Sequence, residues 1–117
     1  MAYVPSQYDR LVSCYMADSS AASSAFTSAP WAGKIVYAYC VIYNAVTTAN
    51  SIVTLKINGT SVTSGAITIT QSGSAAGSVY VATPTALNTI AAGDKIEFAS
   101  DGGATVTAPT MCVAVIR

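Results

Sequence analysis

The sequence contains no histidine and very little charge. Five Lys and Arg balance five Asp and Glu, so 9% of the 117 residues are charged, against about 25% in an average domain. Without histidine, Ser-His-Asp triads, Cys-His pairs and Cys/His zinc sites are excluded. The five cations are scattered, so the chain lacks the basic patch that nucleic-acid binding needs. We therefore expect no catalytic, cofactor-binding or metal-binding residues, and no nucleic-acid partner.

Long hydrophobic runs and targeting signals are missing as well. The longest apolar stretch, Ile35 to Tyr43, is far shorter than the roughly 18 residues that a membrane helix needs. The first residues lack the basic and apolar regions of a signal peptide, and Ala2 stands where myristoylation requires glycine. We expect no membrane partner and no lipid anchor.

Cysteine is scarce, and its spacing excludes common motifs. Cys14, Cys40 and Cys112 lie far apart, with no CxxC pair. Cys40 and Cys112 fall within apolar runs, so we interpret them as small buried hydrophobic residues rather than bridge partners. Any single bridge leaves one cysteine over, which favours synthesis in a reducing compartment.

The chain consists mainly of short apolar segments separated by turn residues. Hydrophobic residues make up 52% of it, and no helical period is visible. Asn58-Gly59 predicts a type I′ hairpin turn, a better interpretation than a glycosylation site. The spacing predicts an all-β fold, an antiparallel β-sandwich that is jelly-roll-like. The expected strands cover residues 35–43, 52–57, 60–63, 67–69, 78–81, 87–90, 95–98, 105–107 and 111–116.

The N-terminal part differs in composition from the rest. Leu11 to Tyr15 favours one short strand, Ser19 to Ser28 is rich in Ser and Ala, and Pro30-Trp31 closes the segment. We predict an N-terminal arm and linker over residues 1–30, ordered against a partner, and a β-sandwich domain over residues 31–117.

The one local cluster of acids offers two chemical interpretations and a structural one. Glu97 and Asp101 could flank a sugar as a glycosidase pair, and with Asp94 they could bind calcium. Asp101-Gly102-Gly103 lacks the alternating ligands of a calcium loop. Asp94 and Asp101 beside glycine are typical of turns. We favour the turn interpretation, and expect a protein that is not an enzyme and has no small-molecule substrate.

Tyrosines mark the first core strand, whose two faces are both apolar. Tyr37, Tyr39 and Tyr43 share one face at strand spacing, and Tyr80 is expected to face outward from another strand. These rings could form a platform for glycans, a subunit interface or part of the packed core, and burial is favoured. Trp31 either anchors the arm to a partner or closes the end of the core. The candidate residues for an interface with another subunit or with a protein partner are Trp31, Tyr37, Tyr39, Tyr43 and Tyr80.

From Gly33 onward the chain is a series of β-turns and Thr-rich strands. Its segments are TLKINGT (residues 54–60), GAITIT (65–70), QSGSAAGSV (71–79), ATPTALNTIAAGD (82–94), KIEFASDGG (95–103) and a hydrophobic last strand. With these segments the chain resembles the small β-rich capsid decoration (cement) proteins of tailed bacteriophages. The resemblance covers about three quarters of the chain and includes no catalytic signature.

The resemblance implies a structural virion protein, made in the host cytoplasm, that binds the outer surface of an icosahedral head and stabilises it. Its expected partners are the major capsid protein and two further copies in a homotrimer. The alternative is a carbohydrate- or receptor-binding module of a phage fibre or tail, with exposed tyrosines. A small hydrolase that uses Glu97 and Asp101 is a third class, disfavoured by the missing histidine and the low charge.

Overall fold

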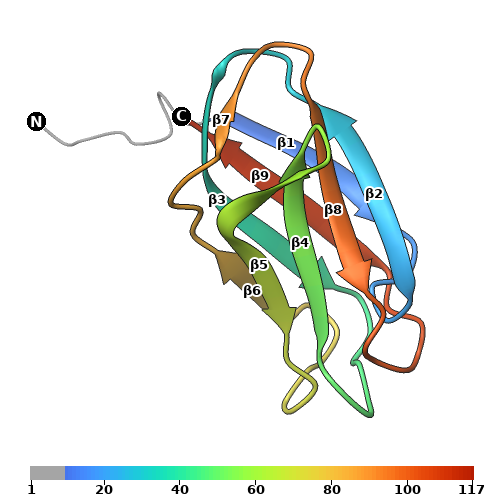
Figure 1. The fold of residues 1–117 in the computed structure, drawn as a ribbon. Helices are drawn as coiled ribbons and strands as arrows, with labels where there is room; N and C mark the ends of the chain where they lie inside the picture. Colours follow the sequence, from blue (N-terminus) through green and yellow to red (C-terminus); the bar gives the residue numbers. More distant parts are fainter. Residues whose placement is uncertain (1–9) are drawn as a thin grey trace, which may run out of the picture.

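The computed structural model describes residues 10–117, and these form two facing β-sheets (Figure 1). The first sheet has the order β1 (Arg10–Met16), β9 (Thr110–Ile116), β3 (Gly33–Ile42) and β6 (Val79–Ala82), with the short β7 (Thr89–Ile90) pairing with the start of β3. The second sheet has the order β2 (Ala22–Ser28), β8 (Lys95–Asp101), β4 (Ser51–Ile57) and β5 (Thr60–Ile69).

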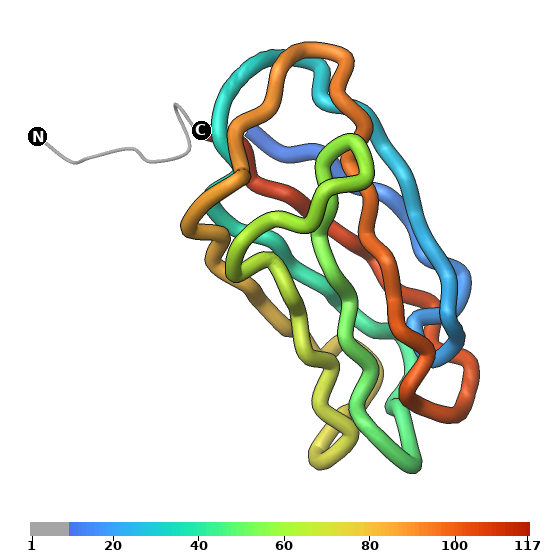
Figure 2. Tube along the Cα trace, in the orientation of Figure 1, coloured from blue at the N-terminus to red at the C-terminus, as the bar shows by residue number. Residues whose placement is uncertain are grey.

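All neighbouring strands are antiparallel, and the chain passes repeatedly from one sheet to the other, as the tube in Figure 2 shows. Leaving β7 aside, the two four-strand orders are those of a jelly roll, in which two Greek keys wrap into a sandwich. The prediction of an all-β, jelly-roll-like sandwich is thus confirmed.

The predicted N-terminal arm is wrong for residues 10–28. These residues form β1, which pairs along its whole length with β9, and β2, which pairs with β8. The Ser/Ala-rich segment can be a strand because β8 supplies the bulk: Ala25 lies opposite Phe98, and both are buried. Residues 1–9 of the predicted arm lie outside the described residues.

The core lies between the sheets and is filled by alternate side chains of nearly every strand. At one end of it, the β1–β2 connection is held by a buried hydroxyl network. Thr110 Oγ1 donates to Ser19 Oγ (2.8 Å), and Ser100 Oγ donates to the Ser19 carbonyl (2.6 Å). The largest fully buried side chains are Met16, Ile35, Ile42, Val46, Val53, Leu55, Ile67, Ile69, Ile96, Phe98, Thr110 and Ile116.

Two details differ from the expected strands. Segments 60–63 and 67–69 belong to one strand, β5, whose pairing with β4 is irregular between Thr54 and Lys56. Gly65 permits the irregularity, because a Cβ there would meet Val62 at 3.0 Å. Residues 105–107 form no strand and contribute only an isolated bridge of Thr105 to Thr47. The Asn58-Gly59 turn is confirmed, since both residues have positive φ (50° and 86°).

The chain's two phenylalanines provide a matched test of this core. Phe98 is 0% exposed and Phe26 is 56% exposed on the outer face of the neighbouring strand. We expect Phe98→Ala to lower the free energy of unfolding by about 3–5 kcal/mol, because it leaves a cavity. Phe26→Ala should cost about 1 kcal/mol or less. Urea denaturation measures both, and equal losses would contradict this assignment of the core.

Candidate functional site

A bulge in β3 determines which side chains the first sheet turns outward. Ile35 pairs with Ile116 and Tyr37 pairs with Val115, so β3 contains one more residue than β9 at this point. Such a bulge reverses the in–out alternation of the strand beyond it. Ile35 therefore lies in the core, whereas Tyr37, two residues later, is 38% exposed.

Beyond the bulge, the outward side chains of the four long strands align in rows across the first sheet. Leu11, Val115 and Tyr37 form the first row. Ser13, Val113, Tyr39 and Val81 form the second, and Tyr15, Met111, Val41 and Val79 form the third. We call these three rows the apolar face. Its members carry no charge, and Ser13 is its one small polar residue.

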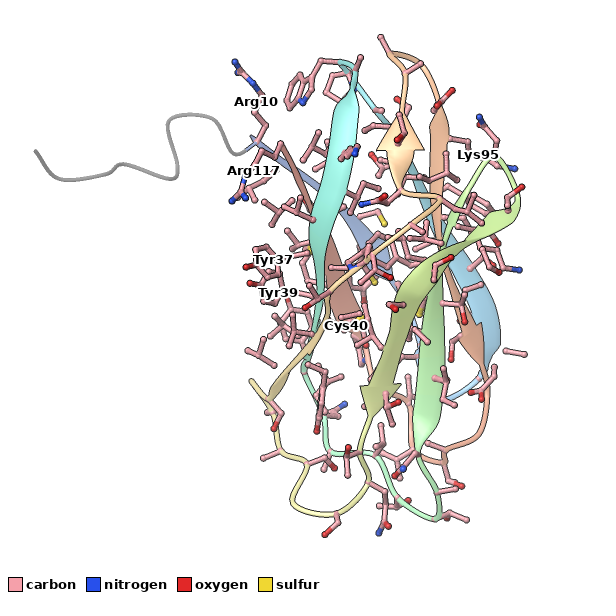
Figure 3. The ribbon with its side chains drawn as sticks, turned by 60° about the vertical axis from the view of Figure 1, so that its left-hand side comes forward. Arg10, Tyr37, Tyr39, Cys40, Lys95 and Arg117 are labelled. Atoms are coloured by element: carbon pink, nitrogen blue, oxygen red, sulfur yellow. The ribbon has the colours of Figure 1, made fainter. Side chains whose placement is uncertain are left out.

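The apolar face is most exposed on its edge strands. Leu11, Tyr15, Val79 and Val81 are each between 53% and 64% exposed, whereas Val115 in the central strand β9 is 8% exposed and the other members of the face in β9 are half-buried. Figure 3 shows Tyr37 and Tyr39 projecting away from the sandwich, and their rings stack with centroids 6.1 Å apart at 29°. A contiguous apolar surface of this kind on a folded domain marks an interaction site.

Three of the predicted interface tyrosines share this side of the sheet. Tyr37 and Tyr39 belong to the apolar face, and Tyr43 extends it beyond the third row, 47% exposed and bonded through its N–H to the Pro109 carbonyl (2.9 Å). Packing of these rings inside the sandwich, one of the forms of burial that the sequence left open, does not occur: Tyr37 and Tyr43 are exposed and Tyr39 is half-buried in residues 10–117. Burial of the rings against a partner stays a prediction.

The prediction that Tyr80 faces outward is wrong. Tyr80 pairs with Cys40, which is fully buried, so its side chain points inward and packs against the core. Its hydroxyl donates to the Thr70 carbonyl (3.2 Å). Val79 and Val81 take the outward positions. An outward Tyr80 would require Val79 and Val81 to point inward. The first sheet is apolar on its outer face as well, so the alternation of residues in β6 does not show which side faces the core.

Trp31 does not lie on the apolar face. It is partly buried against the core, its indole N–H has no hydrogen-bond partner, and the Arg10 guanidinium stands 5.2 Å from its ring centroid. This stacking is a cation–π contact. Of the two roles predicted for Trp31, closing the end of the core fits this position.

The remaining members of the apolar face were not among the predicted site residues. Met111, Val113 and Val115 do lie in a segment whose apolar residues occupy both faces, which is the signal that could have identified them. Leu11 and Tyr15 were hidden in the segment interpreted as an arm.

Charge is distributed unevenly between the two sheets. Lys56, Glu97, Lys95 and Asp101 stand on the outer face of the second sheet. On the first sheet, the cations gather at one end: Lys34 and Arg117, whose backbones bond reciprocally (2.8 and 2.9 Å), continue the outward rows. Arg10 lies beside them in β1, and Figure 3 shows Arg10 and Arg117 near each other, with Lys95 across the molecule.

The acids are engaged structurally and are too widely spaced for a glycosidase pair. Glu97 accepts from Ser24 Oγ (2.8 Å), and Asp101 accepts from the Ile52 and Gly103 amides (2.9 and 3.2 Å). Four residues of strand separate them by about 13 Å, against the roughly 5–9.5 Å of glycosidase carboxylates. Asp94 accepts from the Ala91 N–H (2.8 Å), and this bond lowers its pKa.

The three cysteines form a row beneath the apolar face. Cys112 of β9 lies directly opposite Cys14 of β1 on one side and Cys40 of β3 on the other. All three are free. The hydrogen bond with Cys112, followed by burial, raises the pKa of Cys14. For Cys112, the bond with Cys14 lowers the pKa, but the bond with Cys40 and burial outweigh it and raise the pKa.

This pKa shift predicts a stability change in alkali. Because the folded protein raises the pKa of Cys112 above its ordinary 9.0, stability is fully present below that value and declines as pH rises above it and the unfolded thiol ionises. Relative to Cys112→Ala, the wild type should lose up to about 1.4 kcal/mol of unfolding free energy between about pH 8 and about pH 10. Urea denaturation of both proteins at these two pH values measures the loss, and parallel pH profiles would contradict it.

Among residues 10–117, no group of three His, Cys, Asp or Glu side chains is arranged to hold a metal ion. A search of the same residues for a helix long and apolar enough to cross a membrane also finds none.

The comparisons with known proteins concern the fold. Neither a scan of protein-family models nor a search of curated proteins finds a match. The chain is similar to the catalytic unit of a thermostable GH87 α-1,3-glucanase from Streptomyces thermodiastaticus strain HF3-3, with a TM-score of 0.54, 13% identity, and coverage of 94% of this chain and 26% of that one. It also matches the carbohydrate-binding module CBM36 in complex with calcium and xylotriose, with a TM-score of 0.46, 20% identity, and coverage of 94% and 87%. The first match supports a shared fold, and the second is too distant to add to it.

Proposed function

We propose that this chain is a non-catalytic structural protein that works by burying its apolar face against protein. The observation that carries the proposal is the row-by-row alignment of uncharged side chains across four strands, exposed on a sheet whose inner face already supplies the core. Burying such a surface is the dominant favourable contribution to protein association. Tyrosine and methionine are enriched at protein interfaces, and charged residues are depleted from their centres.

Within that class, we propose a virion role as a capsid decoration protein on the head of a tailed phage. The resemblance of residues 33–117 to such proteins supports it, as does the jelly-roll fold, which recurs among viral capsid proteins. Contacts too weak to act singly become effective when many copies bind one shell. The capsid protein partner, the homotrimer and the location on the head surface belong to this proposal.

Carbohydrate binding is a second candidate, favoured by the exposed and stacked Tyr37 and Tyr39. Aromatic rings can stack on sugars, and the structure of similar fold reported above is the catalytic unit of an α-1,3-glucanase. Against it, the neighbours of these rings in their rows are Val115, Val113 and Val81. Such side chains offer no hydrogen bonds to sugar hydroxyls, whereas a ligand site combines apolar walls with a few placed polar groups.

Co-sedimentation with heads of the encoding phage, prepared without this chain, tests the proposed function. The wild type should bind saturably. The double variant Val79→Lys/Val81→Lys should bind at least about tenfold more weakly, because the interface would have to bury unpaired charges. Thr68→Lys is the matched control, since Thr68 lies on the outer face of β5 in the other sheet, and it should bind like the wild type.

A glycan array run in parallel separates the two candidates. Binding to sugars that is lost in Tyr37→Ala and Tyr39→Ala, together with no binding to heads, would favour the carbohydrate candidate. Binding to neither target would overturn the proposed function.

A further inference from the structure

We infer that the occupant of the apolar face is a second copy of this chain, packed first sheet against first sheet about a two-fold axis. The inference rests on the proposed function, namely that this face is buried against protein, and it names the partner. It replaces the homotrimer of the proposed function, because one flat face shared between two copies closes the assembly at two.

The rows of the apolar face complement one another under this symmetry. If the axis crosses the strands at the middle row, each strand meets its own symmetry mate running the other way, and the first row meets the third. Tyr37 then faces Val41, and Leu11 faces Tyr15, so a large side chain meets a smaller one. In the middle row, each side chain faces its own counterpart, so two Ser13 hydroxyls can pair and two Tyr39 rings meet.

The distribution of charge favours this antiparallel arrangement of facing strands over the other two-fold arrangement, in which the axis runs along the strands and facing strands are parallel. Lys34, Arg117 and Arg10 all lie at the first-row end of the sheet. An axis along the strands would bring two such clusters together, which like-charge repulsion opposes. The antiparallel arrangement places each cluster beside the other copy's third-row end, near Asp18 in the β1–β2 connection. Desolvation raises the pKa of Asp18, but the hydrogen bonds that it accepts from Ser20 and Ala108 together outweigh it and lower the pKa.

The size of the face indicates a dimer of modest affinity. Four strands about 4.8 Å apart, with three rows about 6.8 Å apart, give a footprint of roughly 400 Å² for each copy. Stable interfaces bury about 800 Å² for each partner. The dimer should therefore form in the micromolar range and depend on concentration.

Sedimentation equilibrium of the full chain, from about 1 to 300 μM, tests the inference. The mass should rise from the 11.9 kDa monomer to twice that value. Val81→Lys should weaken association about 100-fold, because the two-fold axis introduces the buried charge twice. Phe26→Lys is the control: Phe26 is 56% exposed against 53% for Val81, but it lies on the second sheet, and its dissociation constant should stay within about threefold of the wild type.

A cross-linking experiment keeps the inference testable if a lysine variant fails to fold. Ser13→Cys places an exposed thiol near the proposed axis, so a short bifunctional maleimide should link two copies. Thr68→Cys, on the other sheet, and the wild type should remain unlinked.

The outcomes separate this inference from the proposed function. A limiting mass of three copies, or a dimer insensitive to Val81→Lys, would overturn the two-fold face. A monomer at every concentration would overturn the self-association. If that monomer still binds phage heads and loses the binding in Val79→Lys/Val81→Lys, the capsid occupies the face and the proposed function stands.

Discussion

The one-residue bulge in β3 decides what this molecule presents to its surroundings. A strand of apolar residues on both faces could place either set in the core, and the pairing with β9 fixes the choice separately on each side of the bulge. Ile35 enters the core before it, and Ala38, Cys40 and Ile42 enter after it. The tyrosines are thereby turned outward, where they join side chains of β1, β9 and β6 into one surface.

The fold class followed from the sequence because its information is local. Alternating apolar residues and the Asn58-Gly59 turn specify strands and a hairpin without reference to distant residues. The strand order is equally regular, but it depends on pairings between residues more than a hundred positions apart, such as Arg10 with Ile116. No local pattern specifies those pairings.

The errors in the predicted site have two physical causes. Apart from Phe26, residues 22–28 are Ala, Ser and Thr, so their strand depends on the bulky partner β8, and composition alone favoured a linker. The orientation of β6 was inferred from the rule that apolar residues lie inside. That rule holds for a domain in which each sheet has one apolar side. Here the Tyr80 side chain lies inside, where its hydroxyl donates to the Thr70 carbonyl, and Val79 and Val81 are exposed. A chain that is apolar on both sides of a sheet does not reveal which side is the core.

The absence of a catalytic arrangement among the described acids and the exposure of the apolar face are related. The few charged residues within residues 10–117 have structural or solubilising roles: Asp94 and Asp101 hold turns, and Lys56, Lys95 and Glu97 hydrate the second sheet. Away from the cationic end of the first sheet, Asp18 in the β1–β2 connection is the one charged side chain of the described residues that lies near this sheet. Water solvates the uncharged apolar face poorly, so removing this face from water by contact with another protein would be favourable in free energy.

The uneven distribution of charge also makes the folded monomer a two-sided amphiphile. The outer face of the second sheet carries charged and hydroxyl groups, and the outer face of the first sheet is apolar. An air–water interface would therefore orient the molecule as it orients a detergent. In a thin aqueous film the monomer would lie flat, with its second sheet toward the water. Images of such films would then be dominated by one view, and any assembly that covers the oily side would restore random orientations.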